Sequence, residues 1–142
     1  MYLLLCDRFR DTCIAAEQEG ILVGFVLSFV PPAHMDTIFI WQVGVAERFR
    51  GQGIGLEMLN HLVAMPSCAS VKFLEATVTL TNAPSRALFA AFARQHEAAI
   101  VQSERYGREL FPNGNHEAEH LLRIGPIGSR MNIAKGDNVA GI

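Results

Sequence analysis

Apolar residues in this chain gather first into strand-length runs. Runs rich in β-branched and aromatic residues, bounded by Gly, Pro or Asn, predict β-strands. They span residues 11–17, 21–30, 37–45 and 72–80. Between the first two lies Gln18-Glu19-Gly20, which predicts a tight turn. The third run is apolar at nearly every position, as expected of a strand buried on both faces.

Two later stretches repeat apolar residues at helical spacing instead. Residues 56–65 place Leu56, Leu59, Leu62 and Val63 on one face, and Pro66 ends the stretch. Residues 84–96 begin with Pro84, whose missing N–H costs little in a first helical turn. Their apolar stripe consists of Leu88, Phe89 and Phe92. We predict a helix in each stretch.

The pattern weakens beyond about residue 100. Residues 111–115 read as a loop, 117–124 as a strand or short helix, and 128–142 as a flexible tail without periodicity. Strands that alternate with helices indicate an α/β, or α+β, layered domain. We expect this domain to span residues 1–127.

Composition narrows the class of protein. The chain has 142 residues, of which 50% are hydrophobic and 18% charged, so one globular domain is expected. A formal charge of -2 gives no electrostatic reason to expect nucleic acid, and no apolar run approaches the roughly 20 residues of a membrane helix. Cys6, Cys13 and Cys68 have no CxxC spacing, which is typical of reduced thiols in a cytoplasmic protein.

The most informative chemistry lies in Arg50-Gly51-Gln52-Gly53-Ile54-Gly55, between the run 37–45 and the helix-like stretch. Glycines let a backbone turn bring its N–H groups close to a ligand, and a helix N-terminus adds oriented positive potential. This arrangement indicates a cradle for a diphosphate. An ordinary tight turn with a solvated arginine is the alternative.

This segment, in its place between a strand and a helix, resembles the Arg/Gln-x-x-Gly-x-Gly/Ala motif of the GNAT N-acetyltransferase superfamily. Asn82, after the next strand, also matches a common GNAT position. A closer resemblance, over nearly residues 2–127, is to the L-2,4-diaminobutyrate acetyltransferases of ectoine biosynthesis. It rests on residues 39–43, 76–79, 82–85, 116–119 and 123–126.

The resemblance implies a GNAT-like mixed, mostly antiparallel twisted sheet flanked by helices. It implies that acetyl-CoA is the acetyl donor and that the acceptor is the 4-amino group of diaminobutyrate. A homodimer is plausible on the same ground. The implied cofactor-binding positions are the backbone at Val43, Val45, Arg50, Gly51, Gly53 and Gly55, together with Asn82.

Candidate residues for binding the acceptor amine follow from the charge of a diamino acid, whose ammonium groups require carboxylates. Glu117 and Glu119 share one face if their segment is a strand, and one of them would bind the ammonium or accept its proton through water. A solvent-facing acidic pair is the alternative. Glu75, inside an apolar strand, is a second candidate base or else a structural carboxylate. Trp41 is a pocket wall or a core residue, while Gln42 and Thr77 are weaker polar candidates.

Two departures from the family pattern affect the expected activity. The chain begins near the end of the helical region that opens a GNAT domain, so the initial strand and helix are expected to be missing. Many GNATs use a tyrosine to protonate the leaving thiolate, and Phe89 stands at that position. Another small amine as substrate, or a non-catalytic fragment that binds coenzyme A, therefore remains as an alternative function.

A zinc-site motif is also present in the sequence. Residues 116–120 read His-Glu-Ala-Glu-His, which matches the His-Glu-x-x-His pattern of zinc hydrolases. That pattern binds zinc only on a helix, where its two histidines lie one turn apart. We expect a strand here and no metal.

Overall fold

The computed structural model describes residues 1–128, so all of the expected tail except Gly128 lies outside the described residues. The described chain contains three α-helices: α1 (Tyr2–Arg8), α2 (Ile54–Ala64) and α3 (Ala83–Gln95). Its six strands are β1 (Ile14–Gln18), β2 (Ile21–Phe29), β3 (Thr37–Val45), β4 (Phe73–Thr79), β5 (Ala99–Tyr106) and β6 (Glu119–Gly125). Among these residues, no helix combines the length and apolar character needed to cross a membrane.

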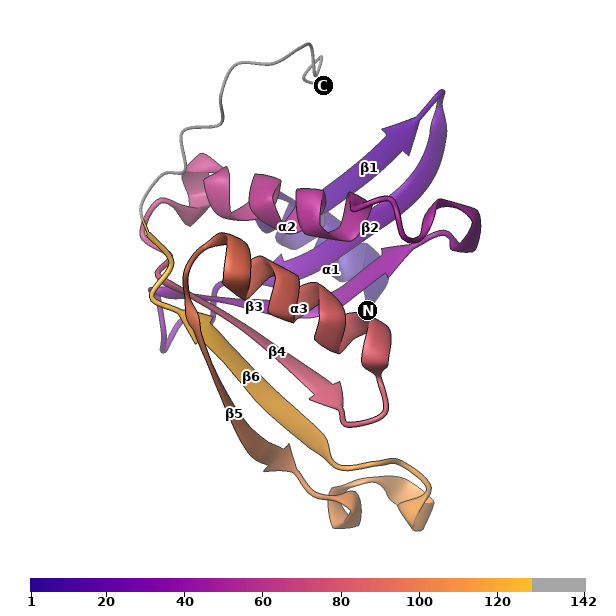
Figure 1. Ribbon diagram of the computed structural model, residues 1–142, viewed down its shortest axis with the longest axis vertical. Coiled ribbons are helices and arrows are strands. Elements are labelled where there is room, and N and C mark those ends of the chain that lie inside the picture. The colour runs from indigo at the N-terminus through magenta and orange to yellow at the C-terminus, as the bar shows by residue number, and fades with distance from the viewer. Residues whose placement is uncertain (129–142) are drawn as a thin grey trace.

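The six strands form one sheet in the order β1-β2-β3-β4-β6-β5. Only β3 and β4 run parallel, and every other neighbouring pair is antiparallel. Figure 1 shows α2 and α3 on the near face of the sheet and α1 behind it. The mixed, mostly antiparallel sheet expected from the resemblance is thereby confirmed.

The core lies between the sheet and the pair α2 and α3. Strands β4 and β6 supply buried, directly paired residues to it: Leu74 with Ile124, and Ala76 with Leu122. Leu59, Leu62, Phe89 and Phe92 of the two helices pack against them. The predicted apolar stripes therefore face the sheet, because burying those side chains supplies most of the driving force for folding.

The elements predicted from the sequence are present with bounds that differ by a few residues. The largest difference at the start is that residues 10–12 form a short 3-10 helix, η1 (Arg10–Thr12), ahead of β1. The open choice at residues 117–124 is settled as a strand that begins at Glu119. Strand β5 was not predicted, because all eight of its residues are exposed and no burial pattern marks it.

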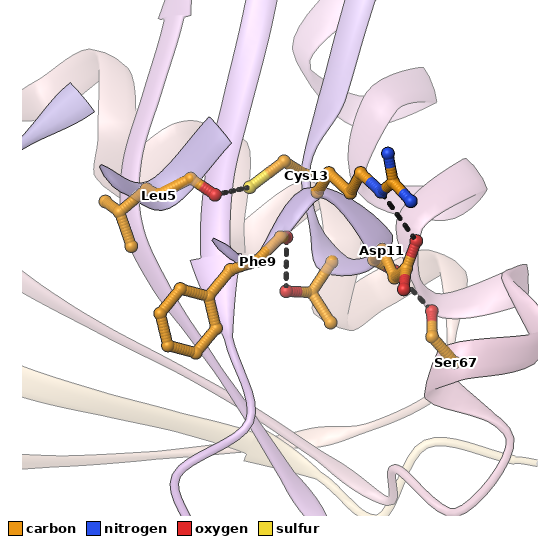
Figure 2. A network of polar contacts seen from close by, with 7 residues as sticks. Leu5, Phe9, Asp11, Cys13 and Ser67 are labelled. Carbon is orange, nitrogen blue, oxygen red and sulfur yellow. Dashed lines mark hydrogen bonds and ion pairs between the residues drawn. The ribbon is translucent and has the colours of Figure 1, made fainter. Parts of the chain in front are cut away.

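Contacts around η1 hold α1 against the sheet and the end of α2 (Figure 2). The Cys13 thiol lies 3.9 Å from the Leu5 carbonyl oxygen of α1, and the Thr12 hydroxyl donates to the carbonyl oxygens of Phe9 and Ser28. Ser67, in the turn that follows α2, donates to the carbonyl oxygen of Asp11. These contacts join three elements that are distant in sequence.

Candidate active site

The candidate site is an opening between the two parallel strands. β3 and β4 pair only from Thr37 with Phe73 to Ile40 with Ala76. Beyond that point β3 stays paired with β2 as far as Val45, while β4 stays paired with β6 as far as Thr79. The facing backbone edges of β3 and β4 are thus released from each other, as their divergence in Figure 1 shows.

A β-bulge in β3 shapes this opening. Ser28 faces Ile40 and Leu27 faces Gln42, so Trp41 is the extra residue on the β3 side. An extra residue changes the phase of the alternation, which allows both Ile40 and Val43 to pack into the helix-side core. The Trp41 ring instead meets Tyr2 of α1 edge-on, with 5.4 Å between ring centroids. Trp41 is half-buried on the α1 side of the sheet.

A cavity of about 240 Å³ occupies the mouth of the opening. Strand β3 contributes Ile40, Trp41, Gln42 and Val43, β4 contributes Ala76, Thr77 and Val78, and the start of α3 contributes Asn82, Ser85 and Phe89. Of the residues predicted from the sequence, Trp41, Val43 and Asn82 are therefore brought together, as are the weaker candidates Gln42 and Thr77.

The glycine turn lies directly beyond the end of β3. Gly51 and Gly53 have φ of +75° and +81°, and the space where a Cβ would stand is open for 4 Å around each. Gly53 caps α2, whose N-terminus therefore opens at this turn. The Arg50 Nε donates to the Val45 carbonyl oxygen at 3.1 Å, which fixes the guanidinium beside the turn. Gly55 packs against Leu88 and brings α2 close to α3.

Helix α3 begins at the opposite wall of the cavity. The Asn82 side chain caps it by accepting a hydrogen bond from the Ser85 N–H at 3.2 Å. Phe89, one helical turn after Ser85, is 2% exposed and lines the cavity with an apolar ring. The sequence-based candidates did not include Ser85, although its position three residues after the capping Asn82 marks it as part of the first turn.

The two candidate glutamates lie near the ends of β4 and β6, but they do not share a strand face. Glu119 opens β6 and pairs with Thr79, whereas Glu117 precedes the strand and accepts from the Thr81 hydroxyl at 2.9 Å. The expected common face was wrong because β6 begins two residues later than predicted. The His116 Nε2 lies 3.9 Å from the Glu119 Oε1, and its ring stacks on Phe111.

The helix required by the zinc motif does not form. His116 precedes β6, while His120 lies within it and pairs with Val78 on the helix side of the sheet. Within residues 1–128, no group of three or more His, Cys, Asp or Glu side chains is arranged to hold a metal ion. His116 was considered only as a metal ligand from the sequence, and its position beside Glu119 was missed.

Glu75 lies at the closed end of the opening. Its side chain is paired with Arg123, and the guanidinium also stacks over Phe73 at 3.9 Å from the ring centroid. Arg123 further donates to the Thr37 hydroxyl on β3. The structure therefore places Glu75 in a cluster that joins three strands and not in the lining of the cavity.

A parallel strand pair that opens beside a glycine turn and a helix N-terminus is the arrangement of one class of acyltransferase. The chain belongs to the GNAT acetyltransferase family, which it matches over residues 1–93. The Ard1 protein of Thermoplasma volcanium shares this fold, with a TM-score of 0.68 at 17% identity over 87% of this chain and 77% of that one.

Within the family, the chain is similar to the L-2,4-diaminobutyric acid acetyltransferases. It is 44% identical to that of Shouchella clausii over 128 residues, which are 90% of this chain and 72% of the relative. It is 43% identical to that of Marinococcus halophilus, over 89% of this chain and 73% of the relative. A solved diaminobutyrate acetyltransferase from Paenibacillus lautus, bound to diaminobutyric acid and coenzyme A, superposes with a TM-score of 0.86. That match has 43% identity and covers 92% of this chain and 79% of the other.

Proposed function

We propose that this chain transfers the acetyl group of acetyl-CoA to the 4-amino group of L-2,4-diaminobutyrate, a step of ectoine biosynthesis. The observation that carries the proposal is the opening between β3 and β4, with its cavity and glycine turn, in a chain so similar to a diaminobutyrate acetyltransferase. Acyl transfer needs a neutral amine, a polarised carbonyl and close approach of the two.

The glycine turn is suited to the diphosphate of acetyl-CoA. The first helical hydrogen bond of α2 runs from the Glu57 N–H to the Gly53 carbonyl oxygen, so the preceding N–H groups have no acceptor within the helix. Among residues 1–128, nothing lies within 4 Å of the point where a Cβ of Gly51 or Gly53 would stand. The backbone from Gly51 to Gly55 would hold the diphosphate, with Arg50 adding positive charge and Asn82 standing at the far wall.

The free edge of β3 would hold the part of acetyl-CoA that connects its diphosphate to its thioester. In the part of the chain that the structure describes, this edge has no partner strand on its β4 side beyond Ile40, so the backbone at Val43 and Val45 can bind the amide groups of an extended arm. Acetyl-CoA supplies an acetyl group already activated as a thioester. The protein's contribution is to orient that group and to polarise its carbonyl with a backbone N–H.

Glu119, Glu117 and Trp41 would bind the diamino acid. Trp41 projects on the α1 side of the sheet, and the Glu119 carboxylate, 25% exposed, lies beside His116 at the start of β6. A half-buried carboxylate beside an imidazole suits removal of a proton from an ammonium group. Glu117 is held by Thr81, which favours a role in binding the ammonium. Glu75 is the weaker candidate for the base, because Arg123 already occupies its carboxylate.

The test is an assay of thiol release from acetyl-CoA with diaminobutyrate, lysine and ornithine in parallel. Rapid release with diaminobutyrate and little with the other two is the expected result. Equal release with another small amine would reassign the acceptor. Tight coenzyme A binding measured by calorimetry, with no turnover on any amine, would make the chain a non-catalytic binding module.

We also propose the setting in which the enzyme works. Three cysteines that are free in the described chain suit a reducing cytoplasm, and ectoine synthesis suits a role in osmoadaptation. A homodimer is proposed because β5 leaves an exposed strand edge at one side of the sheet. Size-exclusion chromatography with light scattering tests the dimer.

A further inference from the structure

The opening between β3 and β4 has two distinct sides. The glycine turn, the N-terminus of α2 and the first turn of α3 lie on the helix side of the sheet, whereas Trp41 lies on the α1 side against Tyr2. Thr77 pairs with Leu121, one position out of phase with the helix-side pair Ala76 and Leu122, so it belongs to the α1 side. A donor held by the glycine turn would therefore bring its sulfur to the cavity from the helix side.

Transfer of an acyl group from a thioester leaves a thiolate, which needs a hydrogen-bond donor. The helix-side wall of the cavity offers few side-chain hydrogen-bond donors. Phe89 presents only carbon atoms, and the Asn82 side chain uses its oxygen to accept from the Ser85 N–H, which leaves its amide NH2 as the one other side-chain donor on this wall. Ser85 contributes the only hydroxyl that α3 places in the lining. Within residues 1–128 this hydroxyl makes no hydrogen bond to another side chain or carbonyl, so it is available to a ligand.

The backbone fixes Ser85 in place. Its N–H is bound by the capping Asn82, and it lies four residues before Phe89, which puts both side chains on one face of α3. The Ser85 hydroxyl therefore lies one turn from the Phe89 ring, on the same wall of the cavity. Because the cap uses the main chain of Ser85, the side chain can be changed without loss of the cap.

We infer that the Ser85 hydroxyl donates the hydrogen bond that stabilises the thiolate of coenzyme A as it leaves. This rests on the proposed use of acetyl-CoA. The bond from the acetyl carbon to sulfur breaks with its electron pair on sulfur, while the new carbon–nitrogen bond forms to the amine. The amine loses one proton to a base or to water, and one proton reaches sulfur from water through Ser85, which regains its own. Hydrogen bonds to charged groups are worth more than those between neutral groups, so this donor selectively favours the thiolate.

The decisive measurement follows the thiol of bound coenzyme A and needs no turnover. The thiolate absorbs in the ultraviolet, so a pH titration of the protein–coenzyme A complex gives the pKa of the bound thiol. We expect Ser85→Ala to raise that pKa by about one unit relative to the unmodified chain. The control Ser103→Ala, on exposed β5, should leave it unchanged. In the double variant Ser85→Ala with Phe89→Tyr, the tyrosine hydroxyl should restore the lower pKa.

Turnover gives the second readout. Ser85→Ala should lower kcat about tenfold with little change in KM for acetyl-CoA, and the added tyrosine should recover most of the loss. An unchanged thiol pKa in Ser85→Ala, or a shift seen in Thr77→Ala instead, overturns the inference. Absence of turnover by the unmodified chain on any amine would refute the proposed function, while the thiol titration would still decide the role of Ser85.

Discussion

The Arg123 Nη1 donates to the Glu75 Oε1 at 2.6 Å, from β6 to its neighbour β4. The same guanidinium nitrogen reaches the Thr37 hydroxyl on β3 at 3.3 Å. One side chain thus links three adjacent strands at the point where β3 and β4 still pair. The strands separate within a few residues of this cluster, so it forms the closed end of the candidate site.

Replacing Arg123 with Met should destabilise the fold by about 1–3 kcal/mol, because it leaves the largely buried Glu75 carboxylate without its partner. Urea unfolding measures the change. The double variant with Glu75→Gln should recover part of the loss, since no unpaired charge then remains. Strict additivity of the two single changes would show that the pair contributes no coupling.

Gly53→Ala should raise the KM for acetyl-CoA and cost about 1–2 kcal/mol of stability, because Gly53 has a φ of +81°. Gly20→Ala is a matched control. Gly20 has a φ of +76° with open space around it, but it lies in the turn between β1 and β2, away from the cavity. We expect a similar loss of stability in Gly20→Ala with an unchanged KM. Equal KM values in the two variants would contradict a cofactor role for the turn.

Glu119→Gln should lower kcat with diaminobutyrate by about a hundredfold or more, because an amide cannot accept the proton of the ammonium group. Glu117→Gln should act mainly on the KM for diaminobutyrate, since the amide oxygen can still accept from Thr81. Glu17→Gln, at an exposed position of β1, is the control and should behave as the unmodified chain. The assignment fails if Glu119→Gln retains full turnover.

Stability should fall when the medium is acidified below about pH 6.5, because burial lowers the pKa of His96 from its ordinary value of 6.5. Between the lowered pKa of His96 in the folded chain and 6.5, the unfolded chain binds more protons than the folded one, so stability rises with pH through this window. His96 lies 2.8 Å from the Asn60 Oδ1 and so connects α3 to α2. Urea midpoints at several pH values test this effect, and His96→Gln should flatten the slope.

Much of the fold could be predicted because burial leaves a pattern in the sequence. The run 37–45 matched β3 at both ends, since a strand covered by helices on both faces is apolar throughout. Strand β5 could not be found in this way. Its stability comes from backbone pairing with β6, which places no requirement on its exposed side chains.

The residues of the candidate site also differ in how far the sequence could predict them. The glycine turn could be predicted because positive φ values restrict the residue type at Gly51 and Gly53. The carboxylates could not be placed, because whether Glu75 faces the cavity or Arg123 depends on strand register. Glu117 likewise contacts Thr81 through a loop whose path no periodicity specifies.

The bulge at Trp41 has a consequence for how β3 can change. Its extra residue keeps Val43 and Val45 in the helix-side core while the tryptophan projects from the other face. Deleting Trp41 would therefore remove the aromatic ring and the bulge together, and would leave Gln42 to Val45 on the faces that they occupy now. The bulge thus gives this half of β3 room to lose one residue while Val43 and Val45 keep their places in the core.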